Sequence, residues 1–180
     1  MGKWNTRTLC AMALLAALMV VLARFIVPMP SATMRFSIEA VPIVIGGLLF
    51  GPAAGALVGL VGDAAGTLFS PYGYNPVFAV APVLTGLCAG MLRHLLYERV
   101  TYWRVLLTFL PAMALGSVVW QSWWLAFFYG SRTFAGFLGM RAVQFAITSI
   151  IDAAIIYGLF RSGIFEKLGF WPPAGKDEAR

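Results

Sequence analysis

Two carboxylates of this sequence lie deep inside apolar stretches, where a charged side chain is costly. Asp63 stands in GLVGDAAGTLF and Asp152 stands in ITSIIDAAIIYGLF. In a membrane such a carboxylate could relay a proton, and two in contact at one depth could form an aspartic-type catalytic dyad. The alternative is a structural role for each, in which Asp63 accepts hydrogen bonds from Ser, Thr or Gln side chains on facing helices. Both lie near the middle of their stretches, so depth alone leaves the dyad open.

A second group of polar side chains is suited to binding rather than catalysis. Four arginines fall near the ends of apolar stretches and could together hold a carboxylate or phosphate, although any one could instead reach lipid headgroups. They are Arg24, Arg35, Arg132 and Arg141. Glu39 follows Arg35 by four residues, so the two share a helix face. We hypothesise that Glu39 holds Arg35 or Arg24 in place when the site is empty.

Amides and aromatic rings accompany these arginines. Gln121 and Gln144 lie inside apolar stretches, and the segment WQSWW surrounds Gln121 with three tryptophans that include Trp124. The tryptophans could form an interfacial belt, or they could wall a pocket for a flat ring whose hydrogen-bonding edge the amides read. The loop SPYGYNP adds Tyr74 on the same side. The combination favours a ligand with a flat heteroaromatic part and an acidic part.

The sequence lacks the usual motifs for metal binding, ATP hydrolysis and nucleophilic catalysis. The two cysteines, Cys10 and Cys88, lie in apolar runs, and His94 has no second His or Cys nearby, so no metal spacing is present. There is no phosphate-binding glycine loop with Lys-Ser/Thr and no nucleophile motif. We therefore expect no catalytic residue, no ATPase activity of its own, and no bound metal, cofactor or nucleic acid.

The composition is that of an integral membrane protein. Hydrophobic residues make up 61% of the 180 and charged residues only 11%, against about 25% charged in soluble domains. The mean hydropathy is +0.84. The apolar runs are continuous rather than alternating, which favours helices over a closed barrel.

Prolines, glycines and polar segments divide the chain into six predicted transmembrane helices in one compact bundle. They cover residues 8–27, 36–50, 53–69, 77–96, 105–129 and 140–160. If both termini are cytoplasmic, nine of the 13 Lys and Arg residues fall on the inside and the four arginines above fall outside. We predict an all-α membrane protein with a substrate-binding domain over residues 1–165 and a polar cytoplasmic tail over 166–180.

The ordered segments MALLAALMVVLARF and RFSIEAVPIVIGGLLFGPAAGALVGLVGD resemble the substrate-binding S components of energy-coupling-factor (ECF) vitamin transporters. The similarity is closest to the folate-specific S component. It implies high-affinity capture of a vitamin, followed by docking on a membrane scaffold subunit with two ATPases, in the plasma membrane of a prokaryote. The implied partner contact falls on Ala13 and Ala17. The implied ligand contacts, with Tyr74 added from the outer loop, are Arg24, Arg35, Tyr74, Gln121, Trp124, Arg141 and Gln144.

Three positions depart from the family pattern. Gln121 replaces an expected Asn, Gln144 an expected basic residue, and Glu39 an expected small residue. One alternative is therefore an S component for pantothenate or another small acid. Alternatives of other classes are an intramembrane aspartic enzyme that uses Asp63 and Asp152, and a secondary transporter that works alone. The last is disfavoured because no inverted repeat is detectable.

Overall fold

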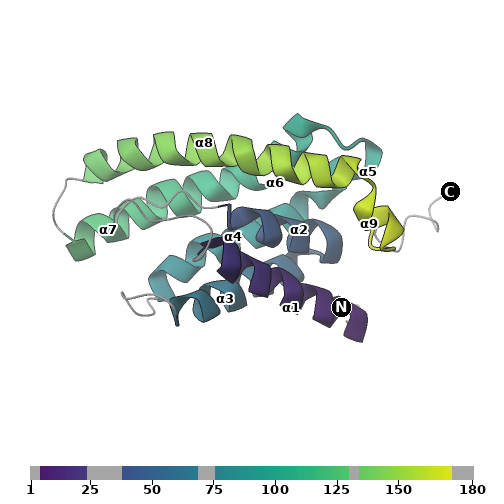
Figure 1. Cartoon of the computed structure of the whole chain (residues 1–180). Coiled ribbons are helices and arrows are strands. Elements are labelled where there is room, and N and C mark those ends of the chain that lie inside the picture. Colours follow the sequence, from purple (N-terminus) through teal and green to yellow (C-terminus); the bar gives the residue numbers. More distant parts are fainter. Residues whose placement is uncertain (1–4, 24–37, 69–75, 130–133, 172–180) are drawn as a thin grey trace.

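The computed structural model describes residues 5–23, 38–68, 76–129 and 134–171, and within these ranges every regular element is helical (Figure 1). The elements in chain order are α1 (Thr6–Val21), α2 (Ala40–Phe50), α3 (Pro52–Thr67), α4 (Pro76–Met91), η2 (Leu92–His94), α5 (Leu95–Glu98), α6 (Tyr102–Ala112), η3 (Met113–Trp120), α7 (Gln121–Tyr129), α8 (Phe134–Arg161) and α9 (Ile164–Lys167). The helix η3 is π-helical and joins α6 to α7 without a break. The prediction of an all-helical chain is confirmed for the described residues.

Within the described residues, three continuous helices are long and apolar enough to cross a membrane. They are Pro76–Tyr97, Tyr102–Trp124 and Phe134–Arg161. Two further helices, Thr6–Val21 and Ala40–Phe50, are apolar but shorter. The predicted first, second and third spans each extend into segments outside the described residues. Six spans therefore remain a prediction.

The sequence predicts a loop over residues 131–139, before a helix that begins near Met140. This prediction is wrong from Phe134 onward, because α8 begins at that residue. The segment FAGFLG contains no proline, and its glycines suggested a turn. Glycine is, however, more frequent in membrane helices than in soluble ones. A Cβ atom at Gly139 would meet no atom within 4 Å, so this glycine is not required by close packing.

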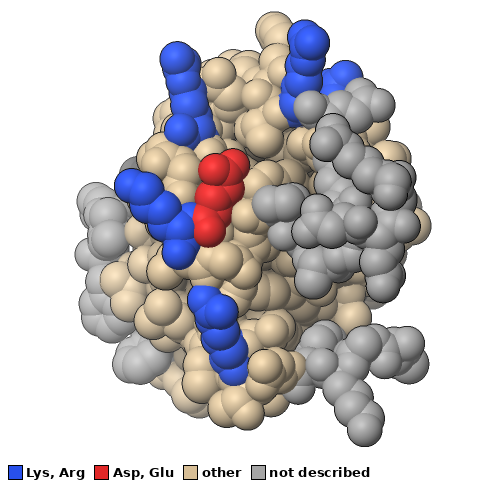
Figure 2. Space-filling model, turned by 90° about the vertical axis from the view of Figure 1, so that its right-hand side faces the viewer, with Lys and Arg blue, Asp and Glu red and all other residues tan. Residues whose placement is uncertain are grey.

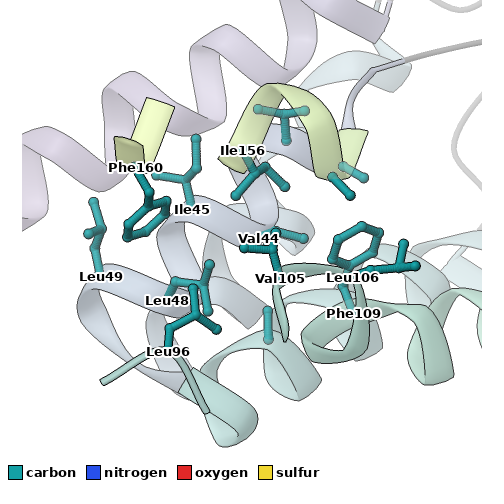
Figure 3. Packing of buried hydrophobic residues seen from close by; sticks show 14 of the residues in the cluster. Val44, Ile45, Leu48, Leu49, Leu96, Val105, Leu106, Phe109, Ile156 and Phe160 are labelled. Carbon is teal, nitrogen blue, oxygen red and sulfur yellow. The ribbon is translucent and has the colours of Figure 1, made fainter. Parts of the chain in front are cut away.

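The short helix α2 lies at the centre of the bundle. Every residue from Ala40 to Leu49 is buried, which explains why this segment is apolar on all sides. Figure 3 shows Val44 and Leu48 among side chains from the α5–α6 region and from α8, including Leu96, Val105 and Ile156. Glu39, the residue that precedes α2, is half-buried.

The helices α3 and α4 pack with their backbones in contact, because glycines four residues apart on each helix, such as Gly55 and Gly59 on α3, permit this close approach. A Cβ atom at Gly86 of α4 would lie 2.2 Å from the carbonyl carbon and oxygen of Gly55 on α3. The turn that leads into α3 depends on Gly51, whose φ of 99° suits glycine. Pro52 follows as the first residue of α3, where its missing N–H is not needed.

Gly86→Ala should therefore destabilise the protein, because the methyl group overlaps backbone that has no free space. Gly158→Ala on α8 is a matched control, since a Cβ there meets nothing within 4 Å and alanine favours a helix by about 1 kcal/mol over glycine. In detergent, thermal unfolding should show a lower Tm for Gly86→Ala and an equal or higher Tm for Gly158→Ala. Equal melting temperatures for Gly86→Ala and the wild type would contradict the packing described.

The C-terminal helix α9 and the residues after it fold back on the end of the bundle that carries the N-terminus of α1. The Arg7 guanidinium donates a hydrogen bond to the carbonyl oxygen of Leu168 and lies 4.7 Å from the centre of the Phe170 ring. Trp171 contacts Phe160 edge-to-face at 5.0 Å. Figure 2 views this end and shows basic side chains spread around it. The proposed domain division at residue 165 stays a prediction.

Candidate functional site

A polar cavity lies where α2, α4, α8 and the α6–η3–α7 helix meet. Its volume is about 70 Å³. The residues that line it are Glu39, Ala40, Ile43, Pro82, Thr85, Met113, Ser117, Gln121, Arg141, Gln144, Phe145 and Thr148. Three of the seven residues predicted to contact a ligand, Gln121, Arg141 and Gln144, are thus brought together although they come from different helices.

Arg141 is the cationic group of this cavity, and its position is fixed by other residues. Its side chain is 7% exposed. Its Nη1 donates to the Gln121 Oε1 at 2.7 Å and to the Ser117 carbonyl oxygen at 2.9 Å. The guanidinium also lies 5.6 Å from the centre of the Phe145 ring. A buried cation held in one orientation is suited to binding an anionic or carbonyl oxygen.

The π-helical segment η3 forms part of the cavity wall and leads directly into Gln121. In a π-helix the hydrogen bonds run from i to i+5, and such segments often occur at functional sites. Met113 and Ser117, both in η3, line the cavity, and Gln121 follows directly as the first residue of α7. The Gln121 Nε2 donates to the Phe78 carbonyl oxygen at 3.4 Å, which ties the amide to α4.

Helix α8 buries its polar side and exposes its apolar side. Arg141, Gln144 and Thr148 follow at helical spacing, and Gln144 and Thr148 are 2% and 5% exposed. The outward-facing residues are apolar, with Val143 at 64% and Ile150 at 56% exposure. This inverted pattern is expected of a helix between lipid and a polar cavity.

Residues 3–161 match the family described as ECF-type riboflavin transporter, S component. The chain belongs to this family. The folate transporter FolT of Clostridium novyi (strain NT) is 27% identical over 151 residues, which cover 83% of this chain and 86% of that protein.

Solved structures of S components have the same fold. FolT bound with folic acid aligns with a TM-score of 0.72 and 27% identity, covering 86% of this chain and 92% of that chain. The S component for biotin from an ECF-type ABC transporter aligns with a TM-score of 0.69 and 18% identity, covering 94% and 100%. The resemblance predicted from the sequence segments is confirmed.

The two carboxylates of this S component do not form a pair. Asp63 is on α3, which packs against α1, α2 and α4, whereas the main neighbours of Asp152 on α8 are α2, α6, η3 and α7. Asp152 is fully buried, and neither of its carboxylate oxygens has a hydrogen-bond partner. A dyad requires direct contact between its two members, so this packing does not favour the aspartic-enzyme alternative.

The tryptophans of the S component lie beside the cavity rather than around it. Trp120 and Trp123 are 40% and 61% exposed, as expected of an interfacial belt. Trp124 stacks edge-to-face on Trp120 at 5.9 Å and on Phe127 at 5.7 Å. It is not among the described residues that line the cavity, so its role as a ligand contact stays a prediction.

The small residues predicted to meet a partner lie on the outer side of α1. Ala13 and Ala17 are exposed, whereas Met12, Ala16 and Met19 face the bundle. The alternative of packing inside the bundle therefore does not hold for this pair. Three other predicted site residues, Arg24, Arg35 and Tyr74, lie outside the described residues.

Sequence reasoning missed four polar cavity residues, namely Glu39 as a lining residue, Thr85, Ser117 and Thr148. Hydroxyl groups in membrane helices commonly bond to their own backbone, as the Thr85 Oγ1 does to the Ala81 carbonyl oxygen at 2.9 Å. They therefore give little signal in a sequence. Thr148 could have been found, because Gln144, Thr148 and Asp152 repeat every four residues along one helix face.

Proposed function

We propose that this protein captures folate, or a closely related pterin acid, at the cavity around Arg141. The observation that carries the proposal is the hydrogen-bonded pair of Arg141 and Gln121 beside Gln144, in a chain that aligns over most of its length with FolT bound with folic acid. The amides suit the hydrogen-bonding edge of a heteroaromatic ring, and the arginine suits an oxygen acceptor. Arg24, Arg35, Tyr74 and Trp124 are proposed as further ligand contacts.

Delivery of the vitamin is proposed to require partners. The S component docks through the exposed Ala13 and Ala17 on a membrane scaffold subunit that carries two ATPases, and ATP is hydrolysed there rather than in this chain. Small residues permit the close approach of a partner helix. The outer side of α1 is exposed and apolar, with Leu14 at 72% exposure. This supports the proposal that a partner docks there.

The proposed topology has six spans, both termini in the cytoplasm and a location in a prokaryotic plasma membrane. Nine of the 13 Lys and Arg residues then fall inside, as the positive-inside rule favours. Among the described residues, Arg7, Arg161 and Lys167 lie at the end where α9 packs against α1. Arg141 then lies toward the outside, where the vitamin enters.

We expect the cavity to widen when such a ligand binds. The volume within its described lining, about 70 Å³, is well below the roughly 300–1,000 Å³ of small-molecule sites. Association should then be slower than diffusion allows, because the cavity wall has to move.

Fluorescence of the six tryptophans tests the proposal directly. The purified protein in detergent is titrated with folate, riboflavin and pantothenate, with correction for absorption by the ligands. Folate should quench the emission saturably at nanomolar concentration. Riboflavin is included because the family carries its name; saturable tight binding of riboflavin but not folate would contradict the proposal, as would tight binding of pantothenate alone.

Asp152→Leu tests the enzyme alternative. Leucine has nearly the shape of aspartate, and it removes a buried polar group whose missing hydrogen bonds cost about 1–3 kcal/mol. We expect Tm to rise, by about 2–4 °C for each kcal/mol, and folate uptake in cells that contain the partner subunits to persist. Asp63→Leu is the control and should not raise Tm, because Asp63 is only partly buried and makes interactions. Loss of uptake in Asp152→Leu with an unchanged protein level would support a functional carboxylate.

A further inference from the structure

The proline in the interior of α4 deprives one backbone carbonyl of its partner within the helix. In an α-helix the N–H of each residue bonds to the carbonyl oxygen four residues earlier. Pro82 has no N–H, so the Phe78 carbonyl oxygen lacks this donor. Inside a membrane such a carbonyl needs another partner, and a neighbouring helix can supply one. A side chain from outside α4 is therefore expected to bond to Phe78.

The amide of Gln121 is that partner. Its Nε2 donates to the Phe78 carbonyl oxygen at 3.4 Å. The preceding residue, Trp120, donates through its Nε1 to the Val77 carbonyl oxygen at 2.9 Å. Two consecutive side chains, at the point where η3 leads into α7, thus bond to two consecutive carbonyls in the first turn of α4. Gln121 is held from the side of α4 by these contacts and bonds on its other side to Arg141 of α8.

The two contacts of Gln121 fix the direction in which its amide points. A guanidinium only donates hydrogen bonds and a backbone carbonyl only accepts them, whereas the two ends of a side-chain amide have opposite roles. The Oε1 must therefore face Arg141, to which it is bonded at 2.7 Å, and the Nε2 must face Phe78. The Phe78 carbonyl consequently determines which end of the amide Arg141 meets.

The α4 backbone at this proline is itself held in place by α3. A Cβ atom at Gly59 of α3 would lie 2.6 Å from the Pro82 carbonyl oxygen, so the two backbones are in direct contact. A substitution at position 82 should therefore leave the path of α4 largely unchanged. Its main effect should be to introduce the N–H that proline lacks.

We propose that Pro82 is a positioning residue of the cavity and acts on Arg141 through the Phe78 carbonyl and the Gln121 amide. The ring of Pro82 lines the cavity, but the missing N–H carries this role. An N–H at position 82 would compete with Gln121 for the Phe78 carbonyl, and the amide would then be free to turn. The expected effect on vitamin affinity rests on the proposed function, whereas the coupling between positions 82 and 121 does not.

The first test separates the N–H of position 82 from the ring. Pro82→Ala and Pro82→Val both introduce an N–H, but only valine keeps an apolar volume close to that of proline. Both variants should bind folate about three- to tenfold more weakly than wild type, the range expected for one hydrogen bond. Leu84→Ala, at an exposed position of the same helix, should bind within about twofold of wild type. A loss in Pro82→Ala that is absent in Pro82→Val would show that only the ring matters and would overturn the proposal.

The second test measures the coupling by thermal unfolding in detergent, without any ligand. Gln121→Met keeps the length of the side chain but removes the N–H that bonds to Phe78. It should lower Tm by at least about 2 °C more in the wild type than in Pro82→Ala, where the introduced N–H satisfies the Phe78 carbonyl. The lost contact with Arg141 is common to both backgrounds and cancels in this comparison. Equal shifts in the two backgrounds would overturn the inference, and Pro82→Val replaces Pro82→Ala if the latter does not fold.

The outcomes separate this inference from the proposed function. Failure of the wild type to bind folate overturns the proposed function, and the melting temperatures still decide whether Pro82 and Gln121 are coupled. Tight folate binding by the wild type with unchanged affinity in both Pro82 variants overturns the positioning role and leaves folate capture intact.

Discussion

Arg141→Ala is expected to weaken folate binding by at least about tenfold. Losing a hydrogen bond that involves a charged group costs about 1.5–3 kcal/mol, and each 1.4 kcal/mol corresponds to a factor of about ten in Kd. Arg141 is 7% exposed and bonds to Gln121 and Ser117. Its loss removes the cation and also releases the amide that it holds in place.

Two further variants separate charge from geometry. Arg141→Lys keeps the charge but loses the planar donors, so its affinity should lie between those of wild type and Arg141→Ala. Arg161→Ala is the control, since Arg161 ends the same helix, is exposed and lies about 30 Å away along the helix axis. Equilibrium titration with folate in detergent measures all of them. An affinity of Arg141→Ala within threefold of wild type would exclude the cavity as the folate site.

Ala17→Trp is expected to abolish folate uptake while leaving folate binding unchanged. Ala17 is exposed on the outer side of α1, and Ala13 lies one turn before it. If a scaffold helix packs closely against these small side chains, an indole ring prevents the approach. The cavity residues lie on α2, α4, α8 and the α6–η3–α7 helix, so the ligand site should be unaffected.

Uptake is measured in cells that contain the scaffold and both ATPases, and binding is measured on the purified S component. Ala154→Trp serves as the control, because Ala154 is an exposed small residue on α8, away from α1. It should retain uptake and binding. Undiminished uptake by Ala17→Trp would place the docking surface elsewhere, whereas a parallel loss of binding would indicate that α1 supports the ligand site instead.

Much of the helical architecture follows from the sequence because a membrane restricts the possible structures. Uninterrupted apolar runs must be helical to satisfy their backbone hydrogen bonds, and Gly51-Pro52 marks the turn between α2 and α3. The start of α8 was predicted too late because glycine is a weaker signal in lipid than in water. The central position of α2 was not predicted, since the sequence of an apolar segment does not show whether lipid or protein surrounds it.

Part of the candidate site could be predicted, because polar and charged side chains are energetically unfavourable in a membrane and therefore stand out in the sequence. Gln121, Arg141 and Gln144 stand out in apolar surroundings, and the structure brings them to one cavity. Glu39 was noticed for its spacing from Arg35, but its place in the cavity depends on the burial of α2. Thr85 and Ser117 were missed because short hydroxyl side chains fit any membrane helix.

The π-helical segment η3 (Met113–Trp120) determines how the cavity responds to a change of chain length. Each residue removed from a regular α-helix turns everything beyond it by about 100°. A π-helical segment commonly behaves as an α-helix that has accepted an extra residue. Deleting one residue within η3 should therefore let this segment return to α-helical geometry and leave Gln121 facing Arg141. The same deletion within α6 should turn the amide away from Arg141, so the two deletions are expected to differ in their effect on ligand binding.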